Sequence, residues 1–202
     1  MKLVVLKFGG TSVADTPQIK KSALKVKEEV NQGYKVIVVV SAMSGVTNNL
    51  IDLVKTTSEI PFYSEYDVVL STGEQVTSAL LATALNNLNI NARSWLGWQV
   101  PIISDNSYGK AVIEEIKTDN ILEYLKKNQV AIISGFQGVS KENRITTLGR
   151  GGSDTSAVAI AAAFSAERCD IYTDVDGVYT TCLLYTSPSP RDSCASRMPS
   201  SA

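Results

Sequence analysis

The stretch LVVLKFGGTS, residues 3–12, decides the fold class because an apolar run passes directly into two glycines. A run that is apolar on both faces is typical of a strand buried in a parallel sheet. Gly9 and Gly10 leave backbone N–H groups open to an anion, beside the ammonium of Lys7. A lysine at a strand end is more often simply solvated, but the two glycines after it favour a phosphate-binding turn.

A second glycine-rich stretch, TLGRGGSDTSA at residues 147–157, opens an alanine-rich helix. Glycines at a helix start expose N–H groups at the positive end of the helix dipole, which favours anion binding. Arg150 stands between glycines and could bind phosphate or carboxylate oxygens with its planar fork of donors. Arg150 could equally be a solvated loop residue, and Asp154 an acid that balances the helix dipole. Two such stretches together predict a phosphate-rich ligand.

Strand and helix patterns alternate along the chain. Strands are expected near residues 3–8, 36–40, 68–70, 92–96, 111–114, 130–133 and 169–173. Helices are expected near 17–32, 48–58, 118–127 and 153–167, with a further helix that starts beyond residue 70 and reaches Leu88. The alternation predicts an α/β fold, a three-layer α/β/α sandwich with a mainly parallel central sheet. Ligands lie at the carboxyl ends of such strands, so the loops after residues 8, 40, 70, 134 and 173 should converge on one crevice.

Composition narrows the class of protein. The chain has 202 residues, 44% of them hydrophobic, and a formal net charge of −1, as in an ordinary globular domain. A pI near 5.6 argues against nucleic acid as a partner. No uninterrupted apolar run approaches the roughly 20 residues of a membrane span, and the chain enters a strand without a signal peptide. We therefore expect no membrane partner and a cytoplasmic location.

The chain contains no histidine, which excludes Ser-His-Asp and Cys-His catalysis and imidazole-ligated zinc. Acid–base chemistry near neutral pH would need a carboxylate or a lysine with a shifted pKa. The three cysteines lack metal-ligand spacing, so no metal site is expected, and Cys169 reads as an unpaired buried thiol.

Composition changes abruptly after Thr181. Residues 182–202 hold half of the prolines and six serines, without amphipathic periodicity, which predicts disorder. We expect this tail to be non-native, translated from cloning or sequencing-adapter DNA.

Standard nucleotide-binding signatures are absent: there is no P-loop, and the glycines at 149 and 151 do not complete a Rossmann fingerprint. Other polar motifs have plain structural explanations. Ser71-x-x-Glu74 fits a helix capping box, and Asp174 with Asp176 could form an Asx turn at Gly177. Taken singly, none of these motifs identifies a function.

Taken together and in order, these motifs resemble the amino-acid kinase family, and within it the aspartokinases. The matching stretches are KFGGTSV at 7–13, SAMSGVTN at 41–48, STGE at 71–74, GFQG at 135–138, the 147–157 stretch, and TDVDGVY at 173–179. The resemblance covers residues 1–181 and favours the aspartate-specific branch over glutamate, acetylglutamate or uridylate kinases.

The resemblance implies an amino-acid kinase (carbamate kinase-like) fold and transfer of the γ-phosphoryl group of ATP to the side-chain carboxylate of L-aspartate. The product would be 4-phospho-L-aspartate, in the first step of the route to lysine, threonine and methionine. Mg²⁺ would arrive with ATP, and the full-length enzyme would be a homo-oligomer. A carboxylate with a pKa of about 3.9 is already deprotonated at neutral pH, so a histidine-free chain needs no general base for this reaction.

The resemblance also implies residue roles. Lys7 and Asp154 would be catalytic, with Asp154 orienting Lys7. The aspartate would be bound by Ser41, Thr47, Glu74, Arg150 and Ser153, with Glu74 meeting its ammonium group. The nucleotide would contact Lys7, Phe8, Gly9 and Gly10, and its adenosine end Thr173, Asp174 and Tyr179.

The chain departs from the family after Thr181, where Cys182 follows in place of an Asp-Pro pair. We expect residues 1–181 to be a kinase domain with an incomplete nucleotide lobe, without the ACT domains that usually bind effectors. This chain should then be weakly active or inactive, below the ordinary kinase range of about 1–100 s⁻¹. Two alternatives stay open: a glutamate or nucleoside monophosphate kinase of the same fold, or a non-catalytic ligand-binding fragment.

Overall fold

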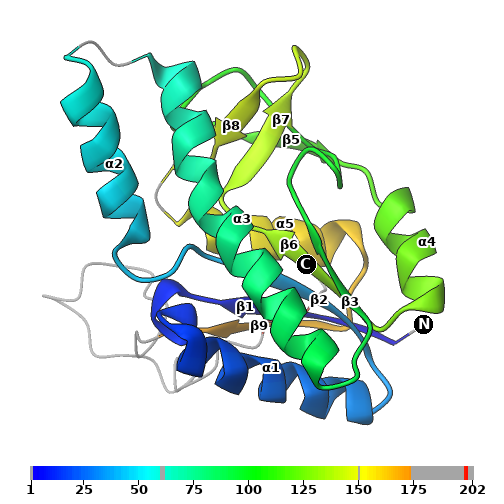
Figure 1. Ribbon diagram of the computed structural model, residues 1–202. Helices are drawn as coiled ribbons and strands as arrows, with labels where there is room; N and C mark the ends of the chain where they lie inside the picture. Colours follow the sequence, from blue (N-terminus) through cyan, green and yellow to red (C-terminus); the bar gives the residue numbers. More distant parts are fainter. Residues whose placement is uncertain (1, 60–61, 150, 174–197, 200–202) are drawn as a thin grey trace, which may run out of the picture.

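The computed structural model describes residues 2–59, 62–149, 151–173 and 198–199 (Figure 1). Its central sheet has the strand order β10-β9-β1-β2-β6-β3. The strands are β1 (Leu3–Phe8), β2 (Lys35–Val40), β3 (Ala92–Trp95), β6 (Val130–Ser134), β9 (Arg168–Tyr172) and β10 (Met198–Pro199). Only the β10–β9 pair among them is antiparallel, so the predicted parallel sheet is confirmed. β10 lies in the tail that was expected to be disordered, so that expectation does not hold at Met198–Pro199, which pair with β9.

The sheet is buried on both faces because its central strands β1, β2 and β6 are apolar except at Lys7, Lys35 and Ser134. β1 pairs with β2 in parallel from Leu3↔Lys35 to Phe8↔Val40. Alternate residues of each strand belong to different core clusters, with Val5 in one and Val4 in the other. A strand with no polar face requires a helical layer on each side, which the sequence also provides.

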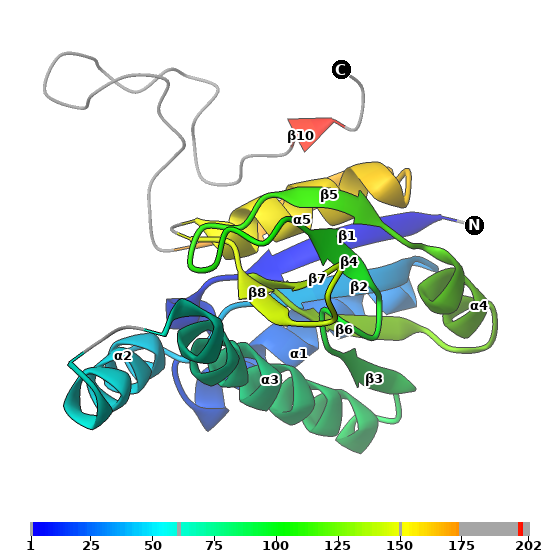
Figure 2. The same ribbon diagram turned by 90° about the horizontal axis from the view of Figure 1, so that it is seen from above.

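The helices form the two outer layers (Figure 2). One face is covered by α1 (Thr16–Asn31) and α3 (Tyr63–Asn87), and the other by α4 (Asp119–Lys127) and α5 (Gly152–Ala163). The predicted three-layer α/β/α sandwich is therefore confirmed. The cap of α1 is Asp15, whose carboxylate accepts from Gln18 N at 2.8 Å, so the helix begins one residue before the expected range of 17–32.

The prediction of a strand at 68–70 is wrong, because α3 continues through it as one helix. Buried positions recur at helical spacing along α3: Asp67, Leu70, Ser71, Glu74, Thr77, Ser78, Leu81 and Leu85. Helical periodicity sustained over 25 residues is stronger evidence for a helix than the apolar run at 68–70 is for a strand. The capping-box interpretation of Glu74 fails with it, since Ser71 Oγ donates to Val68 O in mid-helix.

Among the described helices, α3 alone is long and apolar enough to span a membrane by length and composition. It buries two carboxylates, Asp67 and Glu74, against the rest of the molecule. This is typical of a core helix in a globular domain.

A second sheet, of order β5-β4-β7-β8, lies beside the amino-terminal half of α3 (Figure 1). Its strands are β4 (Ile102–Ser104), β5 (Ile113–Ile116), β7 (Gln137–Ser140) and β8 (Ile145–Thr147). Only β5 was expected, at 111–114; no strand was expected at Gln137–Ser140, where the second half of the GFQG stretch begins β7. The remaining elements are a 3₁₀ turn η1 (Gly10–Val13) and the peripheral helix α2 (Val46–Thr57).

Candidate functional site

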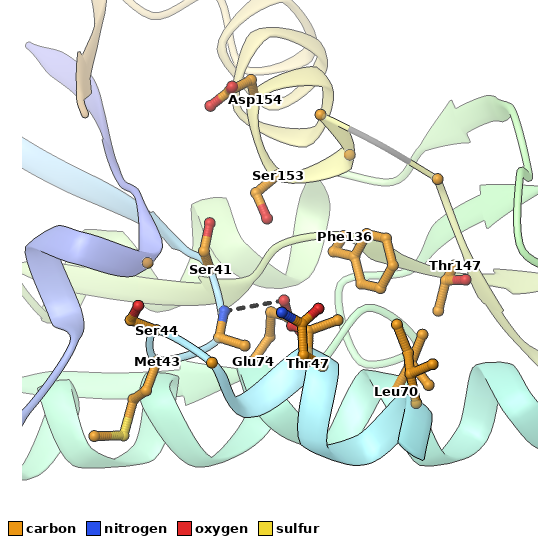
Figure 3. Close-up of a pocket in the computed structure, with 18 of the residues that line it drawn as sticks. Ser41, Met43, Ser44, Thr47, Leu70, Glu74, Phe136, Thr147, Ser153 and Asp154 are labelled. Atoms are coloured by element: carbon orange, nitrogen blue, oxygen red, sulfur yellow. Dashed lines mark hydrogen bonds between the residues drawn. The ribbon is translucent and has the colours of Figure 1, made fainter. Parts of the chain in front are cut away.

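A cavity of about 620 Å³ opens where β1 and β2 end and where α2 and α5 begin. Figure 3 shows Glu74 and Leu70 rising from α3, with Ser153 and Phe136 facing them across the cavity. Its lining includes Lys7, Gly10, Ser41, Thr47, Glu74, Phe136, Thr147, Ser153 and Asp154. The loops after residues 8, 40 and 134 therefore converge here as predicted, the segment after residue 70 is helical, and the loop after residue 173 lies outside the described residues.

Lys7 joins the two glycine-rich stretches. Its Nζ lies 2.6 Å from Asp154 Oδ1, and the lysine side chain is nearly buried while that of Asp154 is half exposed. A Cβ on Gly9 would lie 3.3 Å from the same Nζ, and one on Gly10 would lie 3.1 Å from Ala42 O. Side chains at these positions would crowd the ammonium and the adjoining loop, which explains the double glycine.

Two helices begin at the cavity without a side-chain cap. Gly45 precedes α2 with φ +80°, and Gly151 precedes α5 with φ +72°. Both glycines adopt left-handed conformations that other residues rarely take. The positive ends of two helix dipoles and the Lys7 ammonium therefore border the same cavity, an arrangement that favours a multiply charged anion.

Glu74 supplies negative charge on the opposite side of the cavity. One carboxylate oxygen accepts from Ala42 N at 3.0 Å, drawn as the dashed line in Figure 3, whereas Oε2 is buried without a hydrogen-bond partner among the described residues. Burial raises the pKa of Glu74 to about 7, an effect that the Ala42 N–H only partly opposes. An unpartnered buried carboxylate oxygen at a cavity wall is suited to a cationic group of a ligand.

The structure brings together most of the predicted site residues. Lys7, Gly10, Ser41, Thr47, Glu74, Ser153 and Asp154 all line the cavity. Phe8 and Gly9 do not: Phe8 is in the core, stacked on Tyr172 with ring centroids 4.9 Å apart, and Gly9 N donates to Tyr172 O. Thr173 directly follows β9, at the carboxyl edge of the sheet. Arg150, Asp174 and Tyr179 lie outside the described residues, although Gly149 and Gly151 beside Arg150 line the cavity.

Sequence reasoning did not single out Phe136 and Thr147 as site residues, although both lie in the quoted motifs. Phe136 has φ +64°, an uncommon conformation for a bulky residue and one that recurs at functional sites. A Cβ on Gly152 would lie 2.8 Å from its ring, so that glycine makes room for Phe136 at the start of α5. Gly152 was the feature of the sequence that could have indicated this close contact, but it was interpreted only as part of a helix start.

Cys169, the cysteine that the sequence analysis singled out, does not line the cavity. Cys169 is a buried free thiol, as predicted. Within the described ranges, no group of three or more acidic, cysteine or histidine residues is placed to hold a metal ion.

The model of the amino acid kinase family matches residues 2–182. The chain belongs to this family. A Rickettsia felis protein named aspartokinase is 56% identical over 183 residues, which are 89% of this chain and 46% of that protein. The chain thus spans about half the length of the curated relatives it matches.

Two solved structures of the amino acid kinase family are similar to this chain. The aspartate kinase from Synechocystis has a TM-score of 0.75 and 46% identity, covering 87% of this chain and 29% of that one. The E. coli aspartokinase III in complex with aspartate and ADP has a TM-score of 0.78 and 28% identity, covering 89% of this chain and 51% of that one. The predicted amino-acid kinase fold is confirmed.

Proposed function

We propose that this chain is part of an aspartate kinase, which transfers the γ-phosphoryl group of ATP to the side-chain carboxylate of L-aspartate and forms 4-phospho-L-aspartate. The observation that carries the proposal is one cavity with a buried ammonium at one side and, at the other, a carboxylate oxygen that has no hydrogen-bond partner in the part of the chain that the structure describes. The names of the similar proteins, and the aspartate and ADP in one of them, support this choice of substrates.

Phosphoryl transfer requires little covalent help from the protein, because the attacking carboxylate is already ionised at neutral pH. What the protein must supply is alignment and stabilisation of negative charge. The Lys7 ammonium, held by Asp154, and the amino ends of α2 and α5 would stabilise the phosphates. ATP, with Mg²⁺ as its counterion, supplies the phosphoryl group, and the crowding that a Cβ at Gly9 or Gly10 would cause fits a close backbone approach.

The aspartate would occupy the side of the cavity formed by α2 and α3. Its ammonium would pair with Glu74 Oε2, which otherwise has no partner among the described residues. The hydroxyls of Ser41, Thr47 and Ser153 line the same space and could accept or donate hydrogen bonds to the substrate. We assign its carboxylate to Arg150, by the family resemblance.

Further assignments rest on the resemblance as well. Residues 1–181 would form the kinase domain, followed by a non-native tail at 182–202. Phe8, Thr173, Asp174 and Tyr179 would belong to the nucleotide side. The full-length enzyme would be a cytoplasmic homo-oligomer.

Hydroxylamine trapping of the acyl phosphate tests the function directly. With MgATP, the chain should form hydroxamate from L-aspartate slowly, at less than about 1 s⁻¹. It should form at least about tenfold less from L-glutamate, with no ADP release on UMP. Lys7→Ala should remove the signal because the phosphates lose their buried cation.

Calorimetry on the same chain separates the alternatives. Aspartate binding without any hydroxamate would favour a non-catalytic ligand-binding fragment, and preference for glutamate or UMP would favour another enzyme of the fold. Absence of binding of both L-aspartate and ATP would contradict every one of these functions.

A further inference from the structure

Asp67 is a fully buried carboxylate that the proposed chemistry does not use. It lies on α3, one residue after Tyr66 and three before Leu70, both of which line the cavity. In the part of the chain that the structure describes, no lysine or arginine forms an ion pair with it. Burying an acid without a cation is costly, so its place in the core calls for a compensating role.

Three donors surround the Asp67 carboxylate. Oδ2 accepts from Gly109 N at 3.0 Å and from Thr147 N at 2.8 Å, and Oδ1 accepts from Thr147 Oγ1 at 2.7 Å. Burial raises the pKa of Asp67, and these hydrogen bonds oppose the rise. The two residues that donate are themselves lining residues of the cavity.

The same contacts connect three segments that are far apart in the sequence. Thr147 O accepts from Ala111 N at 2.9 Å, so the 105–111 loop is bound to the end of β8 as well as to α3. A Cβ on Gly149 would lie 3.3 Å from Gly109 O, so this loop packs closely against the segment between β8 and α5. One carboxylate thus joins α3, the loop and the segment leading to α5.

We propose that Asp67 is a positioning residue for substrate binding, which holds the Gly109 and Thr147 wall of the cavity at a fixed distance from Glu74. The inference rests on the proposed function, since L-aspartate is taken as the ligand. Asp67 touches no ligand itself; it acts through the two backbone N–H groups and the threonine hydroxyl. A wall that is free to shift would leave Glu74 in place but separate it from the groups that bind the rest of the substrate.

Asp67→Ala tests the inference by calorimetry of L-aspartate binding to the 202-residue chain. We expect the Kd to rise at least about tenfold, because two buried N–H groups lose their acceptor. Asp67→Asn should stay within about threefold of the parent chain. Its amide oxygen can accept from both N–H groups while its NH₂ donates to Thr147 Oγ1.

A matched control lies at the same interface between α3 and the β7–β8 hairpin. Arg144 forms an ion pair with Glu65 on the exposed side of this interface. Arg144→Gln removes this ion pair between the same two elements but should leave the Kd for L-aspartate unchanged. Thr147→Val removes one of the three donors and keeps the backbone N–H. It should raise the Kd about threefold, and this provides a second measurement if Asp67→Ala does not fold.

Amide hydrogen exchange adds a readout that does not need a ligand. The Gly109 and Thr147 amides should lose protection in Asp67→Ala and keep it in Asp67→Asn. A purely structural role would lower the fraction of folded protein, and with it the number of binding sites, at an unchanged Kd.

The outcomes separate this inference from the proposed function. Failure of the parent chain to bind L-aspartate would overturn both. Binding by the parent chain with an unchanged Kd in Asp67→Ala, or an equal loss in Asp67→Asn, would overturn the positioning role of the hydrogen bonds alone.

Discussion

Glu74 shows at the scale of one residue how a binding group destabilises the free protein. Its pKa of about 7 exceeds the usual 4.5 because of burial. The folded state therefore binds the proton more tightly than the unfolded state, and this contribution to stability is complete below pH 4.5 and is lost as pH rises through about 7. At pH 8 the protein holds a buried charge that accepts a hydrogen bond from Ala42 N.

We predict that Glu74→Gln stabilises the ligand-free chain at pH 8 by about 1–3 kcal/mol and has little effect at pH 5. The amide keeps an acceptor for Ala42 N and removes the buried charge. Urea unfolding at the two pH values measures this. Glu123→Gln, an exposed change on α4, is the control and should alter neither value. Equal effects of Glu74→Gln at both pH values would contradict the assigned titration.

The sequence predicted Lys7, Glu74 and Asp154 as site residues, because charged groups beside glycines or in a family motif can be read locally. The structural setting of Glu74 could not be predicted, because the pattern Ser71-x-x-Glu74 is compatible both with a capping box at a helix start and with a carboxylate in the middle of a helix. Phe136 was missed because its positive φ goes with contacts distant in the sequence: its N–H donates to Ser156 Oγ of α5, and Leu148 N donates to its carbonyl. Such conformations depend on tertiary packing and leave no mark in local propensity.

At the scale of elements, α2 is held against the molecule by close packing on α3. None of its residues is fully buried, and it meets α3 at Gly73, where a Cβ would lie 3.5 Å from Val46 Cγ1 and 3.6 Å from Leu50 Cδ1. The same Cβ would lie only 2.8 Å from Ala42 Cβ. Because Ala42 N binds the Glu74 carboxylate, this contact links helix packing to the cavity.

We predict that Gly73→Ala weakens L-aspartate binding at least about tenfold, although alanine is favoured over glycine in helices by about 1 kcal/mol. The added methyl displaces the Ala42 loop, and the net free energy of unfolding should change by less than about 2 kcal/mol because overpacking offsets the propensity gain. Calorimetry and thermal unfolding on one preparation measure both. Val76→Ala, at an exposed position of α3, should leave binding unchanged; unaltered binding in Gly73→Ala would show that the loop tolerates the methyl.

The elements that the sequence failed to predict are short and carry buried polar residues. β7 begins with Gln137, whose side chain donates to Ser71 O inside α3, and β8 ends with Thr147 on Asp67. Sequence patterns predict turns, and not strands, where polar residues occupy segments of only three or four residues. They are buried here because α3 supplies their partners, which only the assembled fold reveals.

At the scale of the whole molecule, the cavity and an ion-pair cluster that stabilises the fold lie at opposite edges of the central sheet. β9 pairs with β1 although they lie far apart in the chain, and this pairing could not be read from local patterns. The cavity lies at the carboxyl edge of the sheet. At the opposite, amino edge of β9, Arg168 contacts Glu29 of α1 at 2.5 Å and Asp170 at 2.8 Å, and its guanidinium lies 5.0 Å from the ring centre of Tyr34.

We predict that Arg168→Met lowers the free energy of unfolding by about 3–5 kcal/mol, because it leaves two largely buried carboxylates without a cation. L-Aspartate affinity should stay within about twofold at temperatures where the variant is folded, since the cluster lies at the edge of the sheet away from the cavity. Urea unfolding and calorimetry measure the two quantities separately. Adding Glu29→Gln and Asp170→Asn to Arg168→Met should recover part of the lost stability by removing the uncompensated charges. A loss of affinity in the folded single variant would mean that the amino edge of the sheet also shapes the cavity, and the separation of the two edges would then be wrong.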